Sequence, residues 1–365
     1  MTEWCGSAFG SPAGFHREAK RSRAAIETSG EQVLGMLGAG TSEGEILFTG
    51  NSTEAVSLGI LGYARANRRF GRNILSSTIE GPAVQAALSQ LKREGFEIRN
   101  IPVDGEGKYF IDMAEALMDD ETLLICLHAG HSEIGTIQNL EDLASLARER
   151  SIACWVDATA AGGRMPLESL AASVDMLALA PSTFRGPTGV GLLYKRAQVT
   201  LEPLYFADWQ DGGLVPSHEN VAGIVGAGIA AERLRERLGL ELRLLRTRQR
   251  SLWDALRTQV PGVRLVGPGI GSDRLAHQLT VTVEGVDAEG LVLFADLRGL
   301  AIATAGGCLS RGAETHYMLT EVGLSPEAAK QTITLSVSVE TTEEEIENAV
   351  KIILAGAERL RSLSP

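Results

Sequence analysis

Residues 123–157 read LLICLHAGHSEIGTIQNLEDLASLARERSIACWVD, and this stretch decides the fold class. Two short apolar runs, residues 123–127 and 153–156, flank a longer segment, residues 140–150, that is typical of a helix. This order of strand, helix and strand indicates two parallel strands joined by a covering helix. The alternation extends from Glu45 to about Tyr194, and it predicts strands at residues 46–48, 72–75, 97–101, 123–127, 153–156, 176–179 and 190–194.

A second, smaller region follows Asn220. Residues 221–260 are rich in Ala, Leu, Arg and Glu and predict a long connecting helix. Beyond it we expect strands at residues 278–283, 301–304 and 332–337, with helices at 288–297 and 343–360. The last helix starts at Thr341-Thr342 followed by three glutamates, which suits an N-cap and the positive end of a helix dipole. The sequence therefore predicts a large α/β domain over residues 1–225, and a connecting helix with a small α+β domain over residues 226–365.

Composition and charge exclude several classes of function. The chain has 365 residues with 34 Lys and Arg against 46 Asp and Glu, a net charge of -12, and no basic run that would attract nucleic acid or an anionic membrane. Its longest apolar stretch, residues 221–231, is too short to span a bilayer. Four cysteines without CxxC spacing favour a reducing compartment, so we expect a cytoplasmic protein.

Six motifs that follow the predicted strands carry a family resemblance. They are FTGNSTE at 48–54, SEIGTIQ at 132–138, VDAT at 156–159, GPTGVG at 186–191, ENVAGIVG at 219–226 and TTEEEI at 341–346. Their order and spacing resemble the cysteine desulfurase family, within the class V group of fold-type I enzymes that use pyridoxal phosphate (PLP). The resemblance covers nearly the whole chain. It implies a mostly parallel central sheet covered by helices, a smaller α+β domain and a homodimer.

The resemblance also implies a chemistry, in which a lysine before the Gly-Pro turn binds PLP as a Schiff base and a loop cysteine takes sulfur as a persulfide. Ser52 and Thr53 fall where the family binds the cofactor phosphate at a helix start. Asp157 matches the carboxylate that pairs with the pyridine nitrogen. An ordinary turn or N-cap aspartate is the alternative interpretation of Asp157.

The position of the lysine does not match. Residues 181–187 read PSTFRGP and place Thr183 where the family has its lysine, and a hydroxyl cannot form a Schiff base. None of the six lysines follows a predicted strand in a way that could replace it. Other family positions also differ, namely the ring-stacking histidine (Gly81), a glutamine (Ala160), two phosphate contacts (Ala180, Ser182), a threonine before the ENVAG segment (His218) and the substrate-binding arginine (Val339 or Glu340). We therefore expect no covalently bound PLP.

Residues 304–310, TAGGCLS, match the catalytic-cysteine loop of the family and retain its cysteine at Cys308. A glycine-rich loop is an unusual place for a structural thiol, because free cysteines are usually buried. Cys308 together with His128, His131 and His218 has the ligand types of a zinc or iron site. His131 also falls where the family has asparagines that face the cofactor ring. The alternative is an incidental thiol with separate, hydrogen-bonded histidines.

Three functions stay open at this point. The first is a desulfurase-like protein without PLP chemistry that carries sulfur, binds an iron–sulfur cluster or metal, or acts as a scaffold through Cys308. Its partners would be a sulfur acceptor, an iron–sulfur scaffold protein or an active paralogue. The second is a class V enzyme with non-covalent PLP, held by Thr53 and Asp157, or with altered chemistry. The third is an ordinary cysteine desulfurase or selenocysteine lyase.

Overall fold

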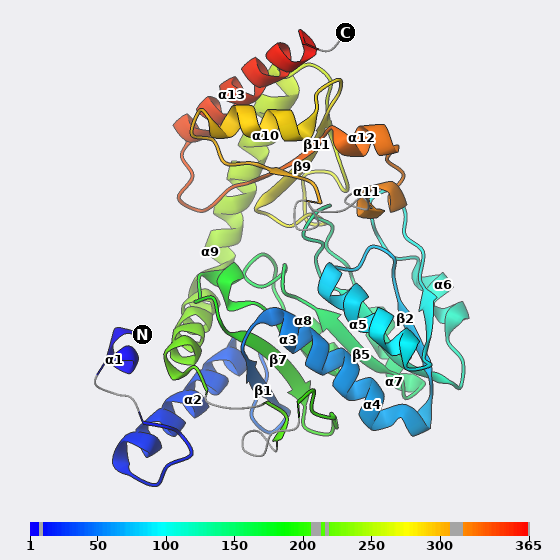
Figure 1. Ribbon diagram of the computed structural model, residues 1–365, viewed down its shortest axis with the longest axis vertical. Coiled ribbons are helices and arrows are strands. Elements are labelled where there is room, and N and C mark those ends of the chain that lie inside the picture. Colours follow the sequence, from blue (N-terminus) through cyan, green and yellow to red (C-terminus); the bar gives the residue numbers. More distant parts are fainter. Residues whose placement is uncertain (7–9, 206–212, 216–218, 307–316, 364–365) are drawn as a thin grey trace. The chain divides into compact units, whose positions relative to one another are not determined.

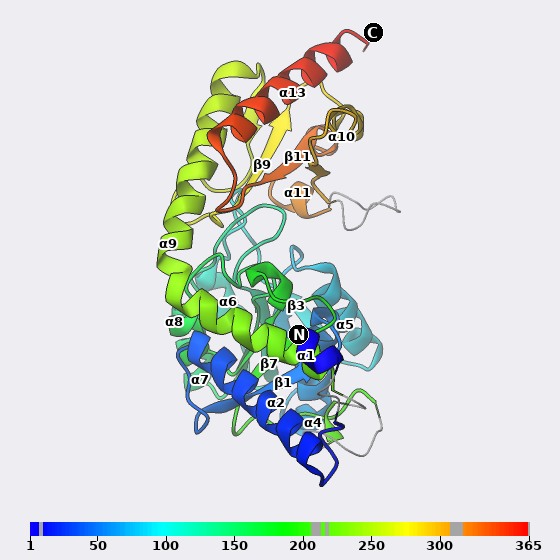
Figure 2. The same cartoon turned by 90° about the vertical axis from the view of Figure 1, so that its left-hand side faces the viewer.

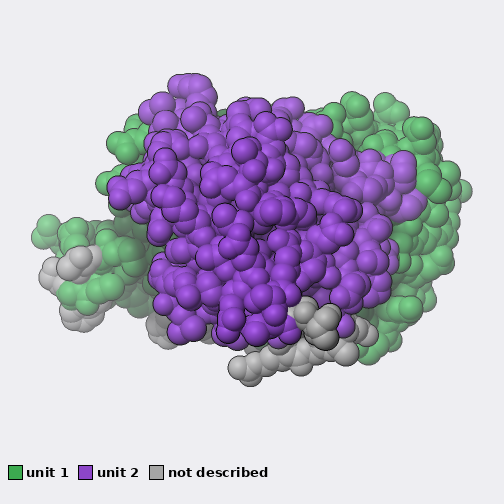
Figure 3. Space-filling model, turned by 90° about the horizontal axis from the view of Figure 1, so that it is seen from above, with its two compact units in different colours: residues 1–101, 111–129, 139–238 green, residues 102–110, 130–138, 239–365 purple. Residues whose placement is uncertain are grey.

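A computed structural model describes residues 1–6, 10–205, 213–215, 219–306 and 317–363. These residues form two compact units, which Figure 3 shows in different colours. Unit 1 comprises residues 1–101, 111–129 and 139–238, and unit 2 comprises residues 102–110, 130–138 and 239–365. The predicted domain division after residue 225 stays a prediction. Within the described ranges, every helix is too short or too polar to cross a lipid bilayer.

Unit 1 is built on a seven-stranded sheet with the order β1-β7-β6-β5-β4-β2-β3 (Figure 1). Its strands are β1 (Gly44–Thr49), β2 (Asn73–Ser76), β3 (Glu97–Asn100), β4 (Thr122–His128), β5 (Ala153–Asp157), β6 (Met176–Leu179) and β7 (Gly191–Arg196). The pairs from β3 through β2, β4 and β5 to β6 are parallel, whereas β7 runs antiparallel to both of its neighbours, β6 and β1. The predicted mostly parallel α/β sheet is confirmed, and β7 is its one reversed strand among the described residues.

Helices cover this sheet. They are α1 (Thr2–Cys5), α2 (Arg17–Met36), α3 (Ser52–Ser57), α4 (Tyr63–Asn67), α5 (Pro82–Arg93), α6 (Ile111–Leu117), α7 (Glu141–Glu149) and α8 (Glu168–Ser173), and a π-helical turn, Leu58–Gly62, joins α3 to α4. Cys126 and Trp155 pack into one core with residues of α3, α4 and α5, which lie in front of the sheet in Figure 1. Side chains alternate between the two faces of a strand, and the residues directly before these two, Ile125 and Cys154, are buried too. The sheet is therefore covered on both faces.

Gly59 in the π-helical turn shows how closely this layer packs. A Cβ at this position would lie 2.3 Å from Nε1 of Trp155, which is fully buried on β5. Glycine is therefore required where the helix crosses the indole ring. This contact fixes the layer of helices that starts at the end of β1.

Unit 2 contains a four-stranded antiparallel sheet with the order β10-β11-β9-β8. Its elements are the end of α9 (Val221–Gln259), β8 (Val263–Leu265), β9 (Gln278–Val283), α10 (Ala288–Asp296), β10 (Ala303–Thr304), α11 (Tyr317–Glu321), α12 (Pro326–Lys330), β11 (Thr332–Ser336) and α13 (Glu343–Arg361). α10 and α13 pack together, and Figure 2 shows α13 running beside β9 and β11. The predicted cap of the last helix is confirmed, because Thr342 and Glu345 form a reciprocal capping box.

Candidate functional site

The carboxyl edge of the unit 1 sheet brings two predicted features together. Asp157 is the last residue of β5 and lies in register with His128, the last residue of β4. The Asp157 carboxylate is partly buried, and its Oδ1 accepts a hydrogen bond of 2.8 Å from the backbone N–H of Thr159. Burial raises the pKa of Asp157, with the charge of Glu80 adding to the rise, while Thr159 and His128 oppose it. A cationic N–H donor would relieve this unfavourable charge.

Sequence reasoning missed Glu80, which belongs to the same edge. Glu80 is fully buried, and its Oε1 lies 3.1 Å from Nδ1 of the buried His128. A Cβ at Gly81 would be 3.8 Å from Oδ2 of Asp157. Because glycine has no side chain, the space beside the carboxylate is open at this position. A lone acidic residue directly before a Gly-Pro helix start, after an apolar strand, was the signal available in the sequence.

The start of α3 forms the second part of the edge. Asn51 caps this helix, with its Oδ1 accepting from the Glu54 N–H at 2.9 Å, and Glu54 Oε2 accepts from the Gly50 N–H at 2.7 Å. The side chains of Ser52 and Thr53 form no hydrogen bond to any other residue in the described ranges, and Thr53 is exposed. Their predicted role in holding a cofactor phosphate stays a prediction.

A tight turn, Pro181–Phe184, follows β6 and carries Thr183. The Thr183 hydroxyl donates a hydrogen bond of 2.7 Å to the carbonyl of Ala180. Arg185 has a left-handed backbone with φ of 64°, and a Cβ at Gly186 would approach Cβ of Pro181 to 2.7 Å. The chain therefore reverses sharply here, with the threonine hydroxyl used to close its own turn.

The lysines lie elsewhere in the two units. Lys195 is buried within β7, where its Nζ lies 2.6 Å from Oε1 of Glu45 and 3.2 Å from the carbonyl of Val199. The other five are on helices or, for one of them, in the loop before α6: Lys20, Lys92, Lys330, Lys351 and Lys108. The carboxyl edge of the unit 1 sheet thus carries the Asp157 carboxylate and, among the described residues, no lysine amine. The expectation of no covalently bound PLP stays a prediction, as does the pairing of Asp157 with a pyridine nitrogen.

The predicted histidine and cysteine metal site stays a prediction, because only His128 and His131 of its four residues lie in the described ranges. His131 lies in the 130–138 segment of unit 2, and its Nδ1 accepts from the N–H groups of Glu133 at 3.0 Å and Ile134 at 3.1 Å. No group of three His, Cys, Asp or Glu side chains within the described ranges is placed to hold a metal ion. His218 and Cys308 lie outside those ranges, so their predicted roles stay predictions.

Two other cysteines have a packing role. Cys126 and Cys154 are buried in β4 and β5. Burial raises the pKa of both thiols, that of Cys154 to about 12, with charge contributions from neighbouring groups such as Glu80 near Cys126. Because the thiolate is the reactive form, both are chemically inert at neutral pH.

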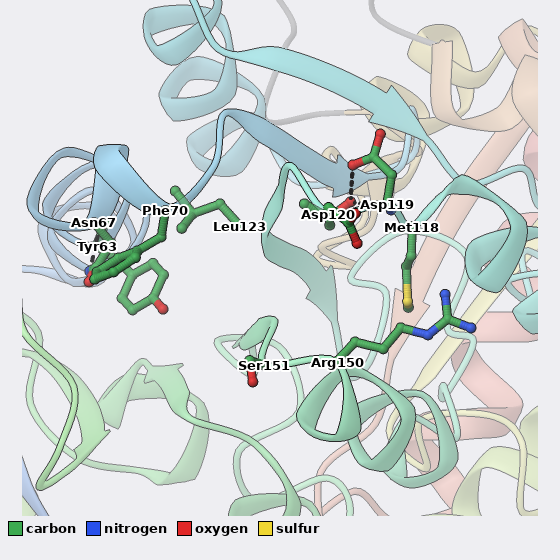
Figure 4. Close-up of a pocket in the computed structure, with 10 residues that line it drawn as sticks. Tyr63, Asn67, Phe70, Met118, Asp119, Asp120, Leu123, Arg150 and Ser151 are labelled. Carbon is green, nitrogen blue, oxygen red and sulfur yellow. Dashed lines mark hydrogen bonds between the residues drawn. The ribbon is translucent and has the colours of Figure 1, made fainter.

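A separate cavity of about 790 Å³ lies in unit 1 at the amino ends of β4 and β5 (Figure 4). Tyr63 and Phe70 lie on one side of it and Asp119, Asp120 and Met118 on the other, with Arg150 and Ser151 below. Arg99 pairs with Asp119 at 2.6 Å and lowers its pKa to about 2, and Arg150 pairs with Glu115 at 2.7 Å. The first pair ties Asp119 to β3 and the second ties Arg150 to α6, so both pairs serve the fold.

Comparison with known proteins identifies the relatives of this fold. The family model "Aminotransferase class-V" matches residues 3–349. The chain is 32% identical over 358 residues to "Cysteine desulfurase IscS 1" of Archaeoglobus fulgidus, covering 98% of this chain and 92% of that protein. It is 33% identical to "Cysteine desulfurase IscS" of Methanosarcina thermophila, covering 98% of this chain and 87% of that protein. A solved "NIFS-LIKE PROTEIN" superposes with a TM-score of 0.89 at 28% identity, covering 100% of this chain and 94% of the other.

Proposed function

Because the chain belongs to the cysteine desulfurase family of class-V aminotransferases, we propose that it is a sulfur-transfer protein of that family that works through Cys308 without a Schiff base to PLP. One observation carries the proposal. The hydroxyl of Thr183, at the position of the family lysine, donates a hydrogen bond to the carbonyl of Ala180. The nearest lysine in sequence, Lys195, pairs with Glu45 inside the sheet. No amine is therefore available to activate the substrate at this edge.

The sulfur-carrier step needs only the Cys308 thiolate and a persulfide donor. The Cys308 thiolate attacks the outer sulfur of the donor persulfide, the sulfur–sulfur bond of the donor breaks, and the donor thiolate leaves with the electron pair. Cys308 then carries the persulfide, and an acceptor thiolate removes the outer sulfur in the same way. The exchange balances without an external oxidant or reductant.

The partners follow from this step and from the family. We place the protein in the cytoplasm as a homodimer, receiving sulfur from an active paralogue and passing it to a sulfur acceptor or an iron–sulfur scaffold protein. The name "Cysteine desulfurase" of the relatives supports sulfur chemistry as the common theme. An iron–sulfur cluster or metal bound through Cys308 is the variant of this function that metal analysis separates from sulfur transfer.

A second candidate function is an enzyme with non-covalent PLP or altered chemistry. It is favoured by Asp157, because a partly buried carboxylate with a raised pKa has a reason to be there if a protonated pyridine pairs with it. The hydroxyls of Ser52 and Thr53 at the start of α3 would supply phosphate contacts. PLP at saturating concentration should then raise the melting temperature, and Asp157→Asn should abolish that rise.

The experiment that tests the proposal combines three measurements on anaerobically purified protein. A visible spectrum before and after borohydride reports a Schiff base, metal analysis reports iron or zinc, and mass spectrometry reports persulfide on Cys308 after incubation with glutathione persulfide. We expect no yellow band that borohydride bleaches. We also expect a mass gain of about 32 Da, the mass of one sulfur atom, and Cys308→Ser should abolish this gain. A bleachable band with PLP-dependent release of alanine from cysteine, or of selenide from selenocysteine, would restore an ordinary desulfurase or lyase and refute the proposal.

A further inference from the structure

Glu133 makes a contact that its family motif does not explain by itself. Its side-chain Oε2 accepts a hydrogen bond from the backbone N–H of Gly306. Gly306 is the last described residue before the 307–316 segment that carries Cys308, and it has a left-handed φ of 87°. Just before it, the Ala305 N–H donates to the carbonyl of Thr332 at 3.0 Å, which continues the pairing of β10 with β11. The contact to Glu133 is therefore made where the sheet ends.

Glu133 is itself held from both sides of its peptide group. Its N–H donates to Nδ1 of His131 at 3.0 Å, and its carbonyl accepts from Nε2 of Gln278 at 2.8 Å and from the Thr280 hydroxyl. Gln278 and Thr280 lie on β9, so the backbone of Glu133 is fixed to the central part of the unit 2 sheet. Because its backbone is fixed in this way, the Glu133 side chain can shift only a little if Gly306 moves.

The contact is also electrostatically specific. Burial raises the pKa of the Glu133 carboxyl, and the Gly306 N–H opposes that rise because it stabilises the charged form. A partly buried carboxylate needs a donor, and an amide at the end of a strand needs an acceptor. Each group therefore satisfies the other, and a change in one leaves the other without its partner.

We propose that Glu133 is a positioning residue for Cys308: its carboxylate fixes Gly306, and so the direction in which the chain enters the segment that carries the thiol. One residue, Gly307, separates Gly306 from Cys308 in the sequence, so the position of Gly306 limits the region that the thiol can reach. The inference rests on the proposed function of Cys308 for its role in sulfur transfer. The anchoring of Gly306 by Glu133 does not depend on that function.

The test uses three substitutions of Glu133 in the full-length protein. Glu133→Gln keeps the reach and an acceptor oxygen but removes the charge, Glu133→Asp keeps the charge but shortens the reach, and Glu133→Ala removes both. Glu347→Gln is the matched control, because Glu347 is exposed on α13 and its carboxylate is 3.9 Å from Lys351. Melting temperatures show which variants remain folded.

Two readouts separate positioning from simple support. Hydrogen exchange of the Gly306 amide should be about tenfold faster in Glu133→Ala and Glu133→Asp than in the control, and intermediate in Glu133→Gln. Sulfur uptake by Cys308 from glutathione persulfide should be about tenfold slower in the Ala and Asp variants and intermediate in the Gln variant. The melting temperatures of these variants should stay close to that of the parent. Rescue of both readouts by Gln relative to Asp is the signature of the hydrogen bond.

The outcomes are distinguishable. Equal Gly306 exchange in the Ala variant and the control would overturn the anchoring. Faster exchange with unchanged sulfur uptake would overturn positioning and leave Glu133 as a structural residue. A parent protein that takes up no sulfur would refute the proposed function, while the exchange data would still decide whether Glu133 holds Gly306. If Glu133→Ala does not fold, the Gln and Asp variants decide the question.

Discussion

Arg274 offers the sharpest test of how the 130–138 segment is held in unit 2. The side chain is fully buried, and its guanidinium donates to three carbonyls. Nε donates to Pro268 at 2.8 Å, Nη1 to Ile134 at 3.2 Å, and Nη2 to Val266. Arg274→Met keeps an unbranched apolar side chain of similar volume and removes all three donors.

The expected loss follows from the three carbonyls that remain. A buried carbonyl that loses its partner costs at least about 1 kcal/mol, so three cost about 3 kcal/mol or more. Burial lowers the pKa of Arg274 to about 10, opposed by Glu106, so charging this side chain is unfavourable, and Met recovers part of that cost. We therefore expect unit 2 to lose about 2–4 kcal/mol of unfolding free energy.

Hydrogen exchange with mass spectrometry measures this loss in each unit separately. Amides of β9 and β11 should exchange about thirty- to a thousandfold faster in Arg274→Met, because 1.4 kcal/mol is a tenfold change. Arg264→Met is the control, since Arg264 pairs with Glu284 at 3.0 Å on the exposed surface and should contribute less than about 1 kcal/mol. The reasoning is refuted if the two variants exchange alike, or if β4 and β5 of unit 1 lose as much protection as β9.

Three further substitutions test unit 1. Gly59→Ala should lower the unfolding free energy by about 1–3 kcal/mol in urea denaturation, because its Cβ would overlap the Trp155 indole. Asp157→Asn should stabilise the protein at pH 7, because the raised pKa of Asp157 makes its ionisation unfavourable to folding; the urea midpoints of parent and variant should converge as the pH falls toward about 4. Thr183→Lys should leave a colourless protein, with or without PLP, if loss of the ring and phosphate contacts is as important as loss of the amine; a borohydride-bleachable band would contradict this.

The sequence predicted the strands of unit 1 well because each is a short apolar run followed by a turn. The predicted runs at 153–156 and 176–179 differ from β5 and β6 by one residue at most. The reversed direction of β7 was not predictable from its own residues, since its apolar run resembles those of the parallel strands. Only its pairing with β1 and β6 reveals the direction.

Unit 2 was harder for a physical reason. β8 has three residues with partly or fully exposed side chains at a sheet edge, so its sequence has neither a long apolar run nor alternation. The segments 102–110 and 130–138 join unit 2 through contacts between distant residues. The Ile137 N–H donates to the carbonyl of Asp273 at 2.8 Å, and Lys108 pairs with the Asp273 carboxylate at 3.7 Å. No local pattern encodes such pairing. The sequence named Asp157 at this edge, and its role there stays a prediction. Sequence reasoning missed Glu80, because a single acid before a Gly-Pro helix start is only a weak signal of burial.

The polar residues at the end of β4 and in the loop after it show how side chains of ligand type can be engaged by the fold itself. In sequence, His128, His131 and Glu133 lie within six residues and have the ligand types that metals prefer. In the structure, each side chain is engaged by a different part of the fold: His128 contacts the buried Glu80, His131 accepts two backbone N–H groups of its own turn, and Glu133 accepts from Gly306. A ligand has to compete with these contacts, and His131 Nδ1 cannot bind a metal without releasing both N–H groups. These three side chains are therefore engaged by the fold itself, and the proposed sulfur transfer rests on Cys308.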